Sequence, residues 1–556
     1  MQKNLFEYSY SIKNLLKFFR KMLVLSFYIL FFSQQLAPAL DKVQIGKINI
    51  NRKNVFDSSS KDWFFAAKLA NSLHIITQEY FITDELLFSE GDTVDTDKLY
   101  ETVRNLRKTG LFSEVKIVLD SADDDKYDIN VQTQDVWSTN PEILFGKGGN
   151  SYNFGGRIAE LNLAGTATAL SLEALFRSEN NIGMQGRGIL LLRRAFRSEY
   201  TLYADLRANK YRTDGELLFY KPFRSIETEY SYGLDLVNNF GRDFIYSITK
   251  DSLNTFRERS LTTWFSKSWL KKDRIFITGL FQLNNDLRLQ HESIRAFDNS
   301  GIVLLAFSSV AQNYTSVSKL NSYHTEDLPT GGWGSAVLGK VFPYGDYNAL
   351  NSCYYLGGQA EASYFDDQLY LFGGVEGGSA FRSSLSYDTY ASVTGLGFYR
   401  LDGSMLIASR FKSQSAWNWR GERQLILDND YGLRGYRLNR LAGDSRLLNN
   451  LEFRYFPDWK FWILNFSGVA FYDLGTVWKQ SEKFTNSRFH HSLGLGLRIY
   501  DDKQNGTAAV FRIDVAYNVD EKRIAEIILT SSQMFNVFGI HDFKLPQIFG
   551  NIFDHE

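Results

Sequence analysis

Long stretches of this chain alternate strictly between apolar and polar residues. From Ile226 to Leu236, every second position holds isoleucine, threonine, tyrosine or leucine, and the positions between them hold glutamate, serine, glycine or aspartate. The segment Thr201–Asn209 repeats the pattern, with Leu202, Ala204 and Leu206 on one side of the alternation. Because successive side chains of a strand point to opposite faces, a period of two predicts strands with one apolar and one polar face.

Composition extends this prediction to most of the chain. Aromatic residues make up 15% of the sequence, and 42 glycines accompany only 7 prolines, which favours β structure over helix or disorder. Beyond Pro141 no segment reaches the ~18 apolar residues that a membrane helix requires. A soluble sandwich would show the same alternation, so the location of the protein decides between a sandwich and a membrane barrel, whose outside is apolar and whose lumen is wet.

The N-terminus predicts export. Basic residues between positions 13 and 21 precede the apolar run Met22–Phe32, and Ala37-Pro38-Ala39 offers the small residues that a signal peptidase reads. We predict a secretory signal peptide over residues 1–39, since the alternative, a membrane anchor, needs about 20 apolar residues. An exported chain with such strands is predicted to form a transmembrane antiparallel β-barrel over residues 139–535. At about 10 residues per spanning strand plus turns and loops, this length accommodates about 16 strands.

Charge, cysteine content and motifs argue against several functions. A formal net charge of −1 gives no electrostatic reason to expect a nucleic acid partner. The single cysteine, Cys353, has no internal partner, and no cysteine and histidine grouping has zinc spacing, so we expect no metal and no cofactor. The segment Gly334–Lys340 is similar to a phosphate loop, but Val341 stands where serine or threonine would hold magnesium. We therefore expect no enzymatic activity and no catalytic residues.

Residues 40–138 have a different pattern, which predicts a small α+β domain. Gln44–Ile50 reads as a strand, and Trp63–Leu73 and Tyr80–Phe88 read as helical or connecting segments. The clearest helix is Thr96–Lys108, in which apolar residues recur at i, i+4 and i+7 on one face and Gly110 follows as a C-terminal cap. The strands that this helix covers are predicted at Val115–Leu119 and Tyr127–Gln132.

Three short segments resemble a POTRA domain. They are Glu90-Gly91-Asp92, the helix end Leu106–Gly110, and Leu111-Phe112-Ser113-Glu114-Val115. This resemblance implies a periplasmic module that holds an extended client by strand addition. The candidate client-binding strand consists of Val115, Lys116, Ile117, Val118 and Leu119.

One charged cluster stands out among the strands near the C-terminus. Arg434 lies between glycines in Tyr431–Tyr436, and two acidic residues follow on predicted strands, Glu452 and Asp473. Strand parity places both carboxylates on the polar face, which points into the lumen. A guanidinium can bridge two carboxylates through charge-assisted, bidentate bonds. The alternative is a chance surface ion pair worth at most ~1 kcal/mol.

Three further segments resemble the BamA/TamA family of outer-membrane assembly barrels, which have 16 strands. The segment Tyr152–Thr166 is similar to that family's second strand and turn, and Leu493–Arg498 and a final strand Ala525–Phe535 are similar to its last strands. Phe535 matches a barrel-closing terminal aromatic, although a C-terminal tail, residues 536–556, follows it.

The same resemblance assigns roles to the charged cluster. Arg434, Gly435 and Tyr436 match the family's motif on a long extracellular loop that folds back into the lumen. Glu452 and Asp473 match the acidic residues that receive the arginine, and Gly475 belongs to the same predicted loop latch. The resemblance implies a structural latch rather than a catalytic site.

The implied function is assembly and insertion of outer-membrane proteins, or translocation of polypeptides, through the POTRA-like domain and a lateral seam between the first and last strands. The expected location is the outer membrane of a Gram-negative-type bacterium, with the small domain in the periplasm. The implied partners are unfolded outer-membrane or exported polypeptides, outer-membrane lipids and accessory lipoproteins. The alternatives are a two-partner secretion transporter and a passive channel or porin.

Overall fold

The computed structural model describes most of the chain after the predicted signal peptide. The described residues are 42–57, 65–121, 126–148, 151–245, 252–269, 273–290, 294–323, 325–344, 351–383, 385–421, 423–436, 441–503, 510–530 and 543–551. The predicted signal peptide, residues 1–39, and the predicted closing residue Phe535 lie outside these ranges.

The N-terminal domain is a four-stranded sheet with helices. Its elements are, in chain order, β1 (Lys42–Lys53), α2 (Phe65–Leu73), α3 (Glu79–Glu85), β2 (Thr93–Asp95), α4 (Thr96–Lys108), β3 (Phe112–Ser121) and β4 (Lys126–Asp135). The sheet order is β2-β1-β4-β3, with β1 parallel to β4 and the other neighbours antiparallel. The short strand β2 was not predicted from the sequence.

The predicted helix of this domain is confirmed with its predicted bounds. The side chain of Asp95 accepts a hydrogen bond from the backbone N–H of Lys98 at 3.0 Å, which caps the start of α4. Gly110 has φ +74°, the left-handed conformation that ends a helix. Leu106 of α4 packs with Phe81 of α3 and Ile129 of β4 in the domain core, and all three are fully buried.

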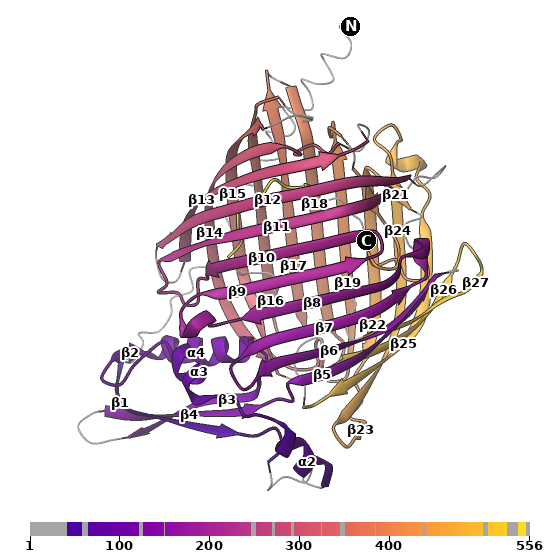
Figure 1. The fold of residues 1–556 in the computed structure, drawn as a ribbon. Coiled ribbons are helices and arrows are strands. Elements are labelled where there is room, and N and C mark those ends of the chain that lie inside the picture. The colour runs from indigo at the N-terminus through magenta and orange to yellow at the C-terminus, as the bar shows by residue number, and fades with distance from the viewer. Residues whose placement is uncertain are drawn as a thin grey trace.

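The rest of the chain closes into an antiparallel barrel (Figure 1). Its strands are β5 (Thr139–Gly148), β6 (Ser151–Leu163), β7 (Thr168–Arg177), β8 (Gly183–Leu192), β9 (Thr201–Asn209), β10 (Arg212–Lys221), β11 (Tyr230–Ile245), β12 (Ser252–Trp269), β13 (Asp273–Arg288), β14 (Ser300–Val317), β15 (Glu326–Pro343), β16 (Cys353–Phe365), β17 (Leu369–Arg382), β18 (Leu385–Arg400), β19 (Met405–Trp417), β22 (Ser445–Tyr455), β24 (Leu464–Trp478), β25 (His490–Asp501), β26 (Val510–Asn518) and β27 (Arg523–Thr530), with the two-residue β23 (Lys460–Phe461) in one turn. A separate two-stranded sheet, β20 (Leu425–Ile426) with β21 (Ala442–Gly443), lies in the loop between β19 and β22.

The predicted strand number is wrong, because the barrel has 20 strands over the described residues rather than about 16. The estimate allowed too many residues for loops. Several connections are very short, such as the three residues between Phe365 of β16 and Leu369 of β17. Periodicity identifies strands but does not determine the length of the loops between them, so a count based on average spacing came out too low.

The two faces of the barrel wall have inverted polarity compared with a soluble protein. On β22, Asn450, Glu452 and Arg454 are fully buried, whereas the apolar residues between and beside them, such as Leu451 and Phe453, are 43% and 39% exposed. The predicted alternation in β11 behaves in the same way, since Leu234 and Leu236 are each 40% exposed. An apolar exterior around a polar interior is the arrangement that a barrel needs in a lipid bilayer. Within the described ranges, no helix is long and apolar enough to cross a membrane.

The N-terminal domain docks on one end of the barrel, which we call the domain end; the opposite end is the distal end (Figure 1). Glu85 at the end of α3 accepts hydrogen bonds from Arg194 at 2.8 Å and Arg224 at 2.9 Å, which belong to the turns after β8 and β10. Glu101 of α4 accepts the backbone N–H of Ile226 at 2.9 Å, and Arg107 pairs with Asp327 of β15 at 3.1 Å. These polar contacts hold α3 and α4 against the mouth of the barrel.

Candidate functional site in the barrel lumen

The loop between β19 and β22 folds back from the distal end into the lumen. Its apolar residues Leu427 and Leu433 are fully buried and pack with Tyr436 and with Leu448 of the wall. Gly432 and Gly435 flank the tip with φ of +110° and +79°, a conformation that most other residues adopt at a cost. This turn directs the side chain of Arg434 toward the wall.

Arg434 reaches carboxylates on three strands. Its Nε and Nη2 donate to the two oxygens of Asp473 on β24 at 2.7 and 2.8 Å, which is a bidentate pair. Its Nη1 donates to Glu452 Oε1 on β22 at 2.9 Å and to Asp514 Oδ2 on β26 at 3.3 Å. All four side chains are fully buried. The structure therefore brings together the three residues that the sequence singled out, and we call Arg434, Glu452, Asp473 and Asp514 the luminal charge cluster.

The surroundings of Arg434 keep it charged. The guanidinium carbon lies 3.5 Å from the ring centroid of Phe471, a cation–π contact. Burial alone would lower the pKa of Arg434, but the neighbouring carboxylates of Asp473, Glu452 and Asp514 outweigh it and raise the pKa above its ordinary value. A charged arginine at this place can tie the strands that carry its carboxylate partners together.

Two acidic residues of this site were missed in the sequence. Asp514 also pairs with Arg498 of β25 at a short distance, and Glu526 of β27 accepts the backbone N–H of Gly435 at 2.9 Å. The signal that could have found Asp514 is the polar alternation of Arg512, Asp514 and Asn518 along β26, which marks a luminal face.

Gly435 and Tyr436 extend the contacts of the loop to the last strands. The side chain of Asn518 on β26 donates to the carbonyl oxygen of Gly435 at 2.9 Å. The hydroxyl of Tyr436 donates to Asp520 at 3.0 Å, in the turn before β27, and accepts the backbone N–H of His491 at 3.0 Å. The loop tip therefore rests on β22, β24, β25, β26 and β27.

Gly475 leaves room for the inserted loop to pack against β24. A Cβ at this position would lie 2.7 Å from Cδ2 of Leu427 and 3.4 Å from Cδ1 of Leu433. We expect Gly475→Ala to displace the loop and to lower the free energy of unfolding by about 1–3 kcal/mol, the usual cost of overpacking. Proteolysis of the loop and thermal unfolding would measure this effect. Gly468→Ala on the same strand is the matched control, because nothing lies within 4 Å of a Cβ there. Equal loop protection in both variants would contradict the packing argument.

The candidate client-binding residues lie on an edge strand. β3 pairs only with β4 among the described residues, so one of its sides has no strand partner there. Val115 points into the domain core at 2% exposed, whereas Val118 and Leu119 are 38% and 37% exposed. An edge of this kind presents free N–H and C=O groups that can accept another strand.

The barrel closes through a seam between β27 and β5, the last and the first of its described strands. Among the described residues, Glu526–Leu529 pair with Phe145–Gly148 in this seam. The seam lies next to β26, on which the loop tip rests.

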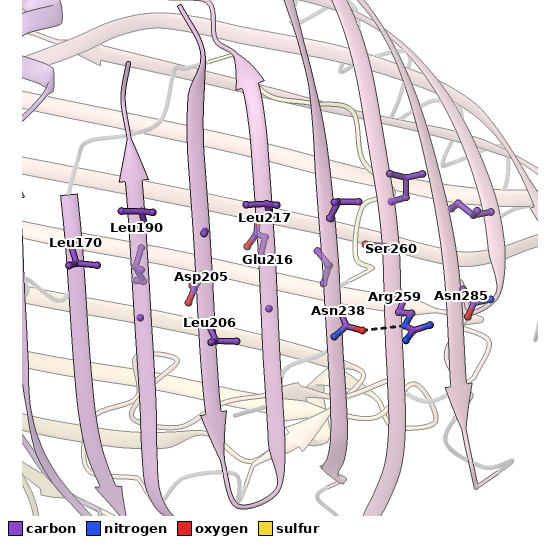
Figure 2. A pocket seen from close by; sticks show the side chains of 18 residues that line it. Leu170, Leu190, Asp205, Leu206, Glu216, Leu217, Asn238, Arg259, Ser260 and Asn285 are labelled. Carbon is purple, nitrogen blue, oxygen red and sulfur yellow. Dashed lines mark hydrogen bonds between the residues drawn. The ribbon is translucent and has the colours of Figure 1, made fainter. Parts of the chain in front are cut away.

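A groove lies on the outer wall across β7 to β13 and encloses about 670 Å³ (Figure 2). Leucines of successive strands line it in a row, including Leu190 and Leu217. Gly188 and Gly215 also line it, and their lack of side chains deepens the groove. At one side of this row, Arg259 donates from Nε to Asn238 at 3.2 Å. Leu206 and Leu217 are 59% and 44% exposed, so the groove faces outward and continues the apolar belt of the barrel. Its apolar lining suits lipid contact.

These features define the chain as a large membrane-type β-barrel with a small N-terminal α+β domain. No protein-family model and no curated protein matches it. The chain is similar to the structure of BamA from Haemophilus ducreyi lacking POTRA domains 1–3, with 12% identity over 87% of this chain and 83% of that chain and a TM-score of 0.35.

Two other solved structures show likeness of the same order. CdiB from Escherichia coli shares 10% identity over 87% of this chain and 75% of that chain, with a TM-score of 0.43. The FrpB iron transporter from Neisseria meningitidis shares 6% identity over 91% of this chain and 93% of that chain, with a TM-score of 0.39. Scores below 0.5 do not establish a common fold, and the barrel is defined by its own strand pairing.

Proposed function

We propose that this protein inserts polypeptides into the outer membrane or passes them across it. The N-terminal domain acts as a POTRA-like module in the periplasm, and the barrel seam serves as a lateral opening. The luminal charge cluster and the loop that carries Arg434 form a latch that fixes the wall beside the seam. Accessory lipoproteins on the periplasmic side are part of the proposal.

The seam between β27 and β5 is the observation that carries the proposal. These strands are the last and the first of the barrel, so no hairpin turn connects them, and they can separate without unravelling a hairpin. The loop tip rests on β26 and β27 through Asp514, Asn518 and Glu526, so it braces one side of the seam from inside. A client strand can add to the exposed edge of an opened seam, and its own pairing and burial in lipid supply the free energy.

The edge strand β3 leads to a test in the periplasmic domain. A photo-crosslinking residue at Val118 is expected to capture extended polypeptides, because strand addition brings a client backbone against this edge. A crosslinker at Tyr100, which is 70% exposed on α4, is the matched control in the same domain. The measurement is recovery of crosslinked outer-membrane or exported proteins from cells. Equal capture at both positions would argue against client binding by β3.

Insertion and passive flux can be separated by reconstitution. The protein in liposomes is expected to speed the folding of an added unfolded outer-membrane barrel, and a census of outer-membrane and secreted proteins after depletion would then show which clients are lost. Flux of small solutes without any effect on polypeptide folding or secretion would instead favour a passive channel. Loss of one secreted protein alone would favour a two-partner secretion transporter.

A further inference from the structure

The C-terminal segment Phe543–Asn551 lies inside the barrel, beyond the last strand. Ile548 and Phe549 are 8% and 1% exposed and belong to a cluster with wall residues of β12 to β18. The backbone N–H of Phe549 donates to the hydroxyl of Tyr355 at 2.8 Å. Tyr355 is 2% exposed, whereas its neighbour Tyr354 is 67% exposed on the outer face. Tyr355 therefore faces the lumen, and so does the segment that contacts it.

The segment follows the luminal face of β16. Tyr355, Gly357 and Glu361 share this face by strand parity. Lys544 forms an ion pair with Glu361 near the domain end of the strand, and Phe549 lies against Tyr355 and Gly357 nearer its distal end. The segment therefore runs opposite to β16, from the domain end toward the distal end.

Both ends of the segment are anchored. At the domain end, the ring of Phe543 lies 4.8 Å from that of Phe223 and 5.2 Å from that of Phe276, measured between centroids, with Trp333 also in contact at 6.3 Å. At the other end, Arg423 of the inserted loop donates to the carbonyl oxygen of Gly550. The C-terminal segment is thus held by the mouth of the barrel, by its wall and by the loop that carries Arg434.

The wall is shaped for this segment. A Cβ at Gly357 would lie 2.9 Å from Cδ2 of Phe549, so glycine leaves the space that the ring occupies. Gly550 has φ +77°, and a Cβ there would lie 2.4 Å from Tyr390. We call the luminal surface formed by Tyr355, Gly357, Glu361 and Tyr390 the peptide groove. It fits a peptide that carries a cation and, five positions later, an aromatic ring, with a turn at Gly550.

A barrel of this size needs such a filling. Barrels of about 16–18 strands already leave an aqueous channel, and still larger ones are plugged. With 20 strands over the described residues, the lumen needs filling beyond the side chains of its wall, and this segment fills the part beside β12 to β18. We propose that the segment Phe543–Asn551 is a plug that closes the lumen by occupying the peptide groove and that must leave the groove before the lumen opens. The proposal does not depend on what the lumen carries, so its failure would leave the proposed polypeptide function standing.

A charge swap in the full chain tests the plug. Lys544→Glu places a carboxylate against Glu361, and Glu361→Lys places an ammonium against Lys544, so each single variant is expected to release the segment. We expect each to raise the open population in planar bilayers by about tenfold, which corresponds to 1.4 kcal/mol. The double variant restores an opposite-charge pair and is expected to conduct much less than either single one. Gln547→Glu, at an exposed position of the same segment, is the matched control and should stay closed.

The single cysteine offers a second measurement. Cys353 is 2% exposed and belongs to the same cluster as Ile548 and Phe549. A water-soluble maleimide is expected to label it slowly in the natural protein and in the double variant, and faster in the single variants. Where a reversed charge prevents folding, Phe549→Ala removes the aromatic anchor without burying a charge and is expected to open the lumen too. Unchanged conductance and unchanged labelling in the folded single variants, or a double variant as open as the singles, would overturn the plug.

Discussion

Replacing Arg434 with alanine is expected to destabilise the barrel by about 3–5 kcal/mol, because removing one partner of a buried ion pair leaves uncompensated charge behind. Glu452 retains Arg454 and Asp514 retains Arg498. Asp473 loses the most stabilisation, because Arg434 supplies both bonds of its bidentate pair. The side-chain amide of Asn450 would still donate a hydrogen bond to Asp473. We therefore expect the loop to leave the lumen and the wall beside the seam to loosen.

Unfolding of the folded barrel in urea and protease cleavage of the loop would measure this loss. Arg488→Ala is the matched control, because Arg488 also lies near the distal end but is 72% exposed, and its pair with Asp520 spans 3.3 Å in solvent. Arg434→Lys keeps the charge but cannot form the bidentate pair, so it is expected to fall between the two. Similar stability of the Arg434→Ala and Arg488→Ala variants would show that the cluster does not act as a latch.

A disulfide across the seam is expected to abolish insertion or translocation of polypeptides while leaving the barrel folded. Lys147 and Ile527 are directly opposite each other in the register of β5 and β27, which suits a cysteine pair. The bond holds the two strands together, so an incoming strand cannot reach the edge of either one. Activity is expected to return when the disulfide is reduced.

The control for this experiment is a disulfide in a part of the wall that the proposal keeps closed. Val303 and Lys340 are opposite each other in the long ladder of β14 and β15, and linking them should not change activity. Both pairs are best placed in a Cys353→Ser background, because Cys353 is the chain's one native cysteine. Full activity with the seam bond completely formed would exclude a lateral opening.

The sequence predicted those helices and strands whose ends are set by nearby residues. The bounds of α4 followed from its apolar face and caps, and the strand Thr201–Asn209 followed from its alternation. The strand number did not follow, because the ends of strands depend on pairing with neighbours. The luminal charge cluster shows the same limit. Arg434, Glu452 and Asp473 could be found from motif and parity, but Asp514 and Glu526 enter the site only because the barrel closes.

The C-terminal segment could not have been placed from its sequence. Its residues from Phe543 to Asn551 mix apolar side chains with Lys544, Gln547 and Asn551 without a helix or strand period, and nothing in their spacing indicates a partner. Tyr355 and Glu361, which receive it, precede it by 194 and 183 residues in the chain. Such a pairing depends on the width of the lumen, which in turn depends on the strand number.

The position of Arg434 in the chain has a consequence for the order of folding. Asp514 on β26, which pairs with Arg434, lies 80 residues further along the chain. Glu526 on β27, which accepts the backbone N–H of Gly435, lies 91 residues after that glycine. These contacts cannot form until nearly all of the wall is in place, and contacts of such separation form late. Insertion of the loop therefore reports that the barrel is complete. A chain cut short before Asp514 would keep the pairs of Arg434 with Glu452 and Asp473 but would lack the contacts of the loop tip with β26 and β27, so a quality-control protease would find the loop less firmly held.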